Sequence, residues 1–522
     1  MLLHAASTGS GPRGQKGIAW GQCTEFNSSE PIQCANLTVP LDYTLPNSSE
    51  TIELQLLRIP AVRQPSKGSI LFNFGGPGVE GRDTMARDGA WYRNSTSEYH
   101  DLVTFDPRGT GNTLFFSCFE DNNERNSYIS GYFGSWSFLS THQYTNSSDT
   151  NPGRLWASAK LFVDKCYEKN KARGGVYGTA FVVRDMLQIV DALDEDGLLR
   201  YWGASYGTLL GQTAAAMFPE RIDKMVLEAN INGHEYYNTF DEEQSTDADK
   251  AFSAIFQWCI ANPYTCALAE RNMTAAQLEE AAYALIDELN SQPIPFGTIL
   301  IDYNMVKSAI SSALGNPNSW RSVTGQLNAL MDQNYDSFID ILSSGYWFIN
   351  PLIDPLTDSL IDSDSSSNSS SKSDALKAIA CGDKIARVSS LDDFLPIMAT
   401  QMGKSRILGD GPIMLEMMCA QWRLNAKERY SGDFGVKTRS PILFIGTTAD
   451  AITPLVSARN MSAAFEGSVV LHVNDYGHGL VSTSTCANKV TADYLVNGTL
   501  PENETFCELD EPIVLEASGD GS

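Results

Sequence analysis

The sequence Gly203-Ala204-Ser205-Tyr206-Gly207 places a serine in the G-x-S-x-G pattern of a nucleophile elbow. Residues 198–202 before it predict a short strand, and residues 208–218 after it, rich in Ala and Leu, predict a helix. The flanking glycines allow a tight, strained turn without side-chain clashes. This strand–turn–helix unit predicts an α/β fold in which the Ser205 hydroxyl projects above the edge of a sheet.

Apolar runs on both sides of the elbow are typical of strands buried on both faces of a mostly parallel sheet. They are residues 37–41, 52–59, 70–74, 102–105, 225–227, 441–445 and 469–473. Residues 181–193 have apolar residues at helical spacing, which places Asp185 and Asp191 on the polar side of the predicted helix. The alternation of strands and helices therefore continues before and after the elbow.

Between residues 231 and 440 this alternation gives way to helical patterns, at residues 251–261, 275–289, 305–314 and 326–331. Residues 362–374 are almost entirely Ser, Asp and Asn and predict a surface loop. The expected organisation is a flexible lead over 1–22, a core over 23–230 and 441–511, a large helical cap insertion over 231–440, and an acidic tail over 512–522.

Composition limits the classes of partner. The 522 residues include 37 basic and 63 acidic side chains, and the net charge of -26 disfavours nucleic acid and anionic membrane surfaces. No apolar run is long enough to span a bilayer. Because the cysteines form no C-x-x-C pairs, a metal site is not expected. We expect a small-molecule or short-peptide substrate, no cofactor, and no nucleic-acid or membrane partner.

Ten cysteines and ten N-x-[ST] sequons indicate an oxidising secretory compartment. Pairing neighbours in the sequence gives the hypothetical disulfides Cys23–Cys34, Cys118–Cys166, Cys259–Cys266, Cys381–Cys419 and Cys486–Cys507. The sequons begin at Asn27, Asn36, Asn47, Asn94, Asn146, Asn272, Asn368, Asn460, Asn497 and Asn503. Residues 1–5 lack the apolar stretch of a signal peptide, so we infer that a signal has been removed or replaced by a start methionine. A secreted or vacuolar glycoprotein with disulfides is expected.

A serine nucleophile needs a histidine base, which a carboxylate orients. His478 lies just after the last predicted strand, between two glycines; His234, at the start of the cap, is the alternative base. Asp450 follows the strand that ends at residue 445, whereas Asp475 is nearer the histidine in sequence and is the competing acid. Asp450 also fits a helix N-cap, and either histidine could be structural.

Phe74-Gly75-Gly76-Pro77-Gly78 follows the predicted strand 70–74. Its glycines let the backbone approach a substrate closely. We expect the amides of Gly76 and Tyr206 to form an oxyanion hole. A phosphate-binding loop is not indicated, because the G-K-[ST] ending is absent.

Together and in order, these motifs resemble the tripeptidyl aminopeptidase-like branch of the α/β-hydrolases, relatives of the prolyl aminopeptidases, from about residue 23 to residue 511. The motifs are 74–78, 105–111, 201–208, 441–446 with Asp450, and 477–478. The resemblance implies an α/β-hydrolase fold and a secreted or vacuolar serine exopeptidase whose helical cap admits the free amino end of short peptides. It assigns Ser205, Asp450 and His478 to a catalytic triad, Gly76 and Tyr206 to the oxyanion hole, and a structural bracing role to Arg108.

An aminopeptidase also needs carboxylates that bind the substrate ammonium. Asp241, Glu242 and Glu243 at the start of the cap are candidates, although a solvated run of charge is the simpler interpretation. Glu80 in the oxyanion loop and His234 are the other candidate substrate contacts; Glu80 could equally point to solvent.

Three positions depart from the family pattern: Glu80, Gly479 after the histidine, and Glu228 after the elbow helix. They leave the triad intact but open an alternative, an ester or lactone hydrolase or cyclase acting on a small molecule or secondary metabolite. In that alternative, cap aromatics would shape an apolar pocket, with Tyr236, Tyr237, Trp320, Trp347 and Trp422 as candidates. A catalytically silent binding protein is disfavoured by the intact motifs.

Overall fold

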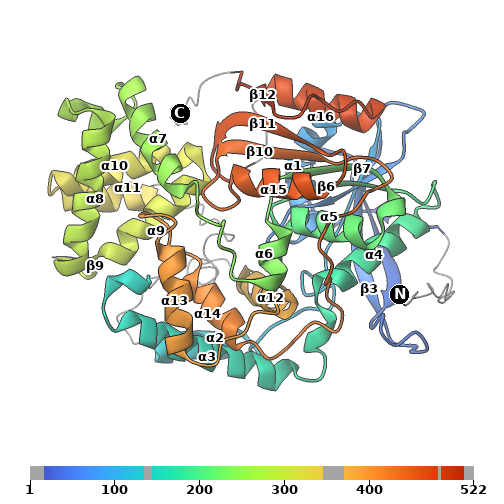
Figure 1. Cartoon of the computed structure of the whole chain (residues 1–522), viewed down its shortest axis with the longest axis horizontal. Coiled ribbons are helices and arrows are strands. Elements are labelled where there is room, and N and C mark those ends of the chain that lie inside the picture. The colour runs from blue at the N-terminus through green and yellow to red at the C-terminus, as the bar shows by residue number, and fades with distance from the viewer. Residues whose placement is uncertain (1–16, 134–143, 345–368, 480–483, 511–522) are drawn as a thin grey trace.

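The computed structural model describes residues 17–133, 144–344, 369–479 and 484–510. A ten-stranded sheet runs through the molecule in the order β1-β2-β3-β5-β4-β6-β7-β10-β11-β12 (Figure 1). These strands are β1 Gly21–Gln22, β2 Gln33–Pro40, β3 Thr51–Ile59, β4 Ser69–Asn73, β5 Asp101–Phe105, β6 Leu199–Ala204, β7 Ile222–Glu228, β10 Leu443–Ala449, β11 Val469–Tyr476 and β12 Thr505–Cys507. From β5 to β12 all neighbours pair in parallel, whereas β1, β2, β3 and β5 pair antiparallel.

Helices cover both faces of the sheet because successive strand residues point to opposite sides. In β4, Phe72 packs with α1 (Gly81–Ser95) and α16 (Thr485–Asn497). Leu71 packs on the other face, in the same cluster as α4 (Thr179–Ala192), α5 (Tyr206–Met217) and α15 (Leu455–Ala464). The predicted α/β-hydrolase fold is confirmed, and each of the eight predicted strands overlaps a strand of this sheet.

The prediction that Asp185 lies on the polar side of α4 is wrong. Asp185 is fully buried, and Arg108 Nε donates to its Oδ2 at 2.5 Å. Arg108 also donates to the carbonyl oxygens of Pro40 and Leu41, so its predicted bracing role is confirmed. The pair and these added hydrogen bonds offset the cost of taking both charges out of water. Asp191 is exposed, as predicted.

The described part of residues 231–440, the segment predicted to form the cap and called the cap below, contains nine α-helices and a hairpin. They are α6 Gly233–Asn238, α7 Ala248–Ala261, α8 Ala275–Ser291, α9 Tyr303–Gly315, α10 Trp320–Met331, α11 Tyr335–Ser344, α12 Ser369–Asp383, α13 Leu391–Met402 and α14 Ile413–Gln421, with the strands β8 Ile294–Phe296 and β9 Ile299–Ile301. Helices α7 to α10 share an apolar cluster of their own. Helices α12 to α14 bury side chains in the same cluster as α4 and α5. Figure 1 shows these two parts of the cap as separate groups of helices.

Three helices that precede the serine in sequence were not predicted: α1, α2 (Asn122–Phe133) and α3 (Asn151–Asn170). Helix α3 packs against α13 and α14 of the cap. The predicted loop over residues 362–374 is partly wrong. Helix α12 begins at Ser369, and residues 362–368 lie outside the described part of the chain.

The five predicted disulfides are confirmed. Cys118–Cys166 ties the loop after β5 to α3, and Cys381–Cys419 ties α12 to α14. Such cross-links fit a protein of an oxidising, secretory compartment. Within the described residues, no helix is both long and apolar enough to cross a membrane.

Candidate active site

Ser205 occupies the sharp turn between β6 and α5 with φ 54° and ψ -123°, which a non-glycine residue rarely adopts. A Cβ on Gly203 would lie 2.2 Å from the carbonyl oxygen of Gly207, and a Cβ on Gly207 would lie 2.3 Å from the carbonyl oxygen of Asn73. The two glycines of the motif are therefore required by close backbone contacts. The backbone N–H of Ser205 donates to the carbonyl oxygen of Glu228 at 3.0 Å and ties the turn to β7.

The glycine loop after β4 lies directly against this turn. Gly75, Gly76 and Gly78 have φ of 102°, 101° and 105°, which favours glycine at each position. A Cβ on Gly75 would lie 2.8 Å from Ser205 Cβ and 3.3 Å from the amide nitrogen of Tyr206. Tyr206 begins α5, so its amide has no acceptor one turn earlier in the helix. The two expected oxyanion donors thus belong to segments in contact.

Asp450 and His478 meet at the carboxyl ends of β10 and β11. His478 Nδ1 lies 2.9 Å from Asp450 Oδ2. The carboxylate also accepts from Thr453 Oγ1 at 2.6 Å and from the backbone N–H groups of Ile452 and Thr453 at 2.8 and 3.0 Å. With four contacts, Asp450 is held in one orientation. The competing acid, Asp475, instead accepts from the backbone N–H of Tyr476.

The electrostatics of His478 favour a base. Burial disfavours its charged form, but the adjacent Asp450 carboxylate outweighs burial and raises the pKa of His478 above its usual value, with a smaller contribution from Glu228. The backbone N–H of His478 donates to the carbonyl oxygen of Gly315 in α9, which anchors the histidine loop on the cap. The alternative base, His234, packs its ring against Phe434 instead.

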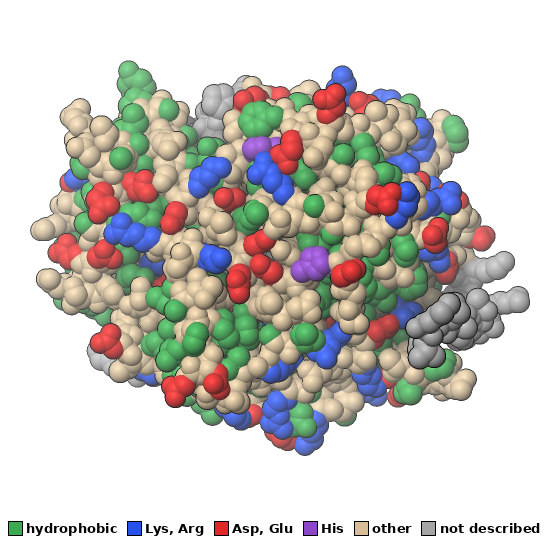
Figure 2. Space-filling view, viewed as in Figure 1, with side chains coloured by type: hydrophobic (Ala, Val, Ile, Leu, Met, Phe, Trp, Pro, Cys, Tyr) green, Lys and Arg blue, Asp and Glu red, His purple; other side chains and the backbone are tan. Residues whose placement is uncertain are grey.

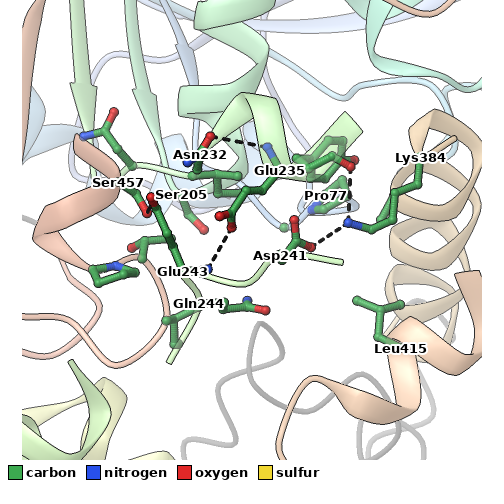
Figure 3. Close-up of a pocket in the computed structure, with 18 of the residues that line it drawn as sticks. Pro77, Ser205, Asn232, Glu235, Asp241, Glu243, Gln244, Lys384, Leu415 and Ser457 are labelled. Carbon is green, nitrogen blue, oxygen red and sulfur yellow. Dashed lines mark hydrogen bonds and ion pairs between the residues drawn. The ribbon is translucent and has the colours of Figure 1, made fainter. Parts of the chain in front are cut away.

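A pocket that encloses about 780 Å³ with its open mouth lies over Ser205 (Figure 3). Its described lining comes from the glycine loop after β4, the elbow, the start of the cap, α12, α14, the loop after β10 and α15. The lining residues are Gly76, Pro77, Ser205, Asn230, Ile231, Asn232, Glu235, Tyr236, Asp241, Glu243, Gln244, Leu376, Ala380, Lys384, Leu415, Ile452, Thr453, Pro454 and Ser457.

Three carboxylates, Glu235, Asp241 and Glu243, project from one segment of this wall. Glu243 accepts from Ser457 Oγ at 2.7 Å with one oxygen and from Asn460 Nδ2 with the other. Asp241 pairs with Lys384 Nζ at 2.7 Å. Lys384 is the one basic side chain among the described lining residues.

Glu235 differs from the other two carboxylates. Its Oε2 accepts from the backbone N–H of Glu243 at 2.7 Å, and no other donor in the described residues contacts its carboxylate. Burial, with the neighbouring carboxylates of Glu243, Asp241 and Glu242, raises the pKa of Glu235 to about 7. Among the residues that the structure describes, Glu235 therefore has no cation as a partner.

Only some of the substrate contacts predicted from the sequence line the pocket. Glu242 is exposed, and Glu80, His234 and Glu242 are absent from the described lining, whereas Asp241 and Glu243 line the pocket. Glu235 and Lys384 were missed, because their sequence neighbourhoods carry no motif. Among the candidate aromatics, Tyr236 lines the pocket, Tyr237, Trp320 and Trp422 are buried in apolar clusters, and Trp347 lies outside the described residues.

The face of the molecule seen in Figure 2 carries interspersed charges. Figure 2 shows acidic and basic side chains mixed on the viewed face, without a broad basic patch. Across the described part of the chain, no group of three or more His, Cys, Asp or Glu side chains is placed to hold a metal ion. The Asp450–His478 pair, and an elbow serine that lies against the glycine loop, are parts that acyl-transfer chemistry requires.

The chain is similar to known proteins over most of its length. Residues 407–507 match the family model described as TAP-like protein. The chain is 24% identical to the tripeptidyl aminopeptidase of Streptomyces lividans over 94% of its own length and 86% of the relative. It is 25% identical to the serine protease Hip1 and 25% identical to the carboxylesterase B of Mycobacterium tuberculosis, again over 94% of this chain and 91% and 89% of those proteins.

Proposed function

Because this chain is a serine hydrolase of the α/β-hydrolase fold that resembles the tripeptidyl aminopeptidases, we propose that it is an exopeptidase acting at the free amino ends of short peptides. The products would be single residues or short peptides. The printed names of two relatives, a tripeptidyl aminopeptidase and a serine protease, support a peptide substrate. Because the sequence identities to these relatives are near 25%, the carboxylates of the pocket wall are the stronger argument for a peptide substrate.

The proposed mechanism follows from the contacts of the triad. Ser205 Oγ attacks the carbonyl carbon, and His478 accepts its proton on Nε2 because Nδ1 is held by Asp450. The amides of Gly76 and Tyr206 stabilise the oxyanion of the tetrahedral intermediate. His478 then protonates the leaving amine, and water releases the acyl group from Ser205 by the same steps in reverse.

The observation that carries the peptide proposal is the uncompensated Glu235 carboxylate. Glu243 is engaged by α15 and Asp241 by Lys384, so Glu235 is the carboxylate of this wall that is left to bind a cation. In Figure 3 it lies between Ser205 and Lys384. A substrate ammonium would supply the missing charge and would bring the amino end of the chain to a fixed position relative to Ser205.

Activity-based labelling combined with a substrate panel tests this proposal. Wild type and Ser205→Ala are treated with a fluorophosphonate, and turnover is measured with free-amino peptide amides, amino-blocked peptides and simple esters. We expect labelling of wild type only and a strong preference for free amino ends. Failure of the wild type to label would contradict a serine nucleophile, and equal rates on blocked and free peptides would contradict the exopeptidase.

A second candidate function is hydrolysis or cyclisation of a small-molecule ester or lactone. It is favoured by the apolar part of the pocket lining, Ile231, Leu376, Leu415 and Ile452, and by the relative named carboxylesterase B. Fast turnover of apolar esters with indifference to an amino group would select it.

We also propose that the protein is secreted or vacuolar. Five disulfides support a secreted or vacuolar protein, and the sequons of residues such as Asn36, Asn47 and Asn497 are exposed at the asparagine. We propose N-glycosylation at such exposed sequons. Enzymatic deglycosylation that left the mass of the secreted protein unchanged would contradict it.

A further inference from the structure

The side chain of Tyr206 takes part in a buried polar network that the mechanism above does not use. Its phenol oxygen lies 2.6 Å from Thr179 Oγ1, and Thr179 Oγ1 donates to Asp383 Oδ2 at 2.5 Å. The Thr179 hydroxyl has a single hydrogen, which it gives to the carboxylate, so the phenol must be the donor in the first contact. A chain of donors therefore runs from Tyr206 to Asp383, and all three side chains are buried.

Asp383 is the last residue of α12 and lies where the cap meets the core. Its Oδ1 accepts from the backbone N–H of Thr179, the first residue of α4, at 3.0 Å. Its Oδ2 also accepts from the hydroxyl of Tyr236, which lines the substrate pocket, at 3.2 Å. The next residue, Lys384, donates to the carbonyl oxygen of Tyr236 at 3.2 Å. One carboxylate thus contacts, directly or through one hydroxyl, the elbow, a core helix and the pocket wall.

The carboxylate of Asp383 is shielded from solvent. The side chain has no exposed surface and no direct ion pair within the described residues. Burial raises the pKa of Asp383 to about 7, while its hydrogen bonds to Thr179 and Tyr236 act in the opposite direction. Removal of this acceptor would leave buried hydroxyls without their partner, so they would have to move.

We propose that Asp383 is a positioning residue for the oxyanion hole. Through Thr179 it fixes the ring of Tyr206, and through Tyr236 it ties that ring to the wall of the pocket. Because oxyanion donors act over a narrow range of distance, a small displacement of the Tyr206 amide weakens stabilisation of the transition state. The inference rests on the proposed oxyanion role of Tyr206, but it does not depend on whether the acyl group comes from a peptide or an ester.

A double-mutant cycle tests this coupling. Asp383→Asn, Tyr206→Phe and the double variant are compared for the rate of fluorophosphonate labelling and for kcat and KM on an activated aryl ester and a free-amino peptide. We expect each single change to lower kcat about tenfold, a fraction of the loss of a whole oxyanion donor. KM should change less than about threefold, and the double variant should be no slower than the slower single variant.

Thr179 supplies a rescue test that does not require Asp383 to be changed. Thr179→Val should lower kcat as Tyr206→Phe does, whereas Thr179→Ser keeps the hydroxyl and should restore it to within about twofold of wild type. This pair keeps the inference testable if Asp383→Asn does not fold.

Asp374→Asn is the matched control, because Asp374 lies on the same helix and is equally buried but does not line the pocket. Its carboxylate instead pairs with Arg125, whose Nη1 lies 3.1 Å from Asp374 Oδ1. It should lower the melting temperature but leave kcat within about twofold of wild type. Additive effects in the cycle, or wild-type labelling rates in the variants, would overturn the inference. A wild type that labels but ignores free amino ends overturns the exopeptidase alone, and a wild type that never labels overturns both.

Discussion

The buried carboxylates of the core and those of the pocket wall differ in how completely they are satisfied. Asp450 accepts four hydrogen bonds, and Asp185 is held by Arg108 and Tyr43. On the cap side, Asp241 Oδ1 in the wall is buried without a hydrogen-bond partner in the described residues, and so is Oε2 of Glu416, which does not line the pocket. Native proteins rarely leave buried polar atoms unpaired without a reason.

This difference separates chemistry from recognition. The core holds its acid in one geometry before any substrate arrives, as general-base catalysis requires. The wall contains one carboxylate, Glu235, that has no ion-pair partner among the described residues. Lys384 lies 2.7 Å from Asp241 and 3.6 Å from Glu416, and burial, with the neighbouring charge of Asp241, raises the pKa of Glu416 and favours its neutral form. A positively charged group of the substrate would complete this wall.

Breaking the satisfied region should have the largest effect. Asp450→Asn removes the charge that orients and stabilises His478, so we expect kcat/KM to fall by about a thousandfold or more, with the fold intact. Asp450 raises the pKa of His478, so this pKa should be lower in the variant. The acidic limb of the pH–activity profile should therefore shift to lower pH. Retained activity with an unmoved limb would contradict the pairing of Asp450 with His478.

Breaking the unsatisfied region should affect binding and leave chemistry in place. Glu235→Gln keeps the shape but removes the charge, and a lost charge-assisted hydrogen bond corresponds to an increase of about ten- to a hundredfold in KM for free-amino peptides. Turnover of amino-blocked esters should be unaffected by the substitution. Glu242→Gln is the matched comparison: this exposed neighbour lies outside the described lining, so its KM should change less than about twofold.

The pH dependence of KM sharpens the same contrast. The pKa of Glu235 is raised to about 7, so its carboxylate loses its charge as the pH falls through neutrality. KM for free-amino peptides should therefore fall as the pH rises through about 7, and rise again near pH 8 as the substrate amine, with its ordinary pKa of about 8, loses its proton. Glu235→Gln should remove the first limb and keep the second. An acidic limb that survives in Glu235→Gln would assign it to another group.

The sequence predicted the core far better than the wall, for a physical reason. Ser205, Asp450 and His478 each follow a strand, and strands are recognised from local apolar runs, so the predicted contact of Asp450 with His478 is confirmed. Glu235 and Lys384 face the same pocket from α6 and the end of α12, and no local pattern tells which side of a short helix a distant segment will cover. The prediction that Asp185 lies on the polar side of its helix failed for the same reason, because its partner Arg108 is 77 residues away in the sequence.

The smallest expected effect concerns the contact that ties the wall to the core. Ser457 of α15 donates to Glu243 Oε2 at 2.7 Å, and the backbone N–H of Glu243 donates to Glu235. Ser457→Ala leaves Asn460 as the remaining donor to Glu243, so we expect this segment to be less well fixed and KM for free-amino peptides to rise about three- to fivefold, the equivalent of one ordinary hydrogen bond. If Ser457→Ala lowered kcat and left KM unchanged, Glu243 would belong to the reacting centre, and the separation between a catalytic core and a recognising wall would fail.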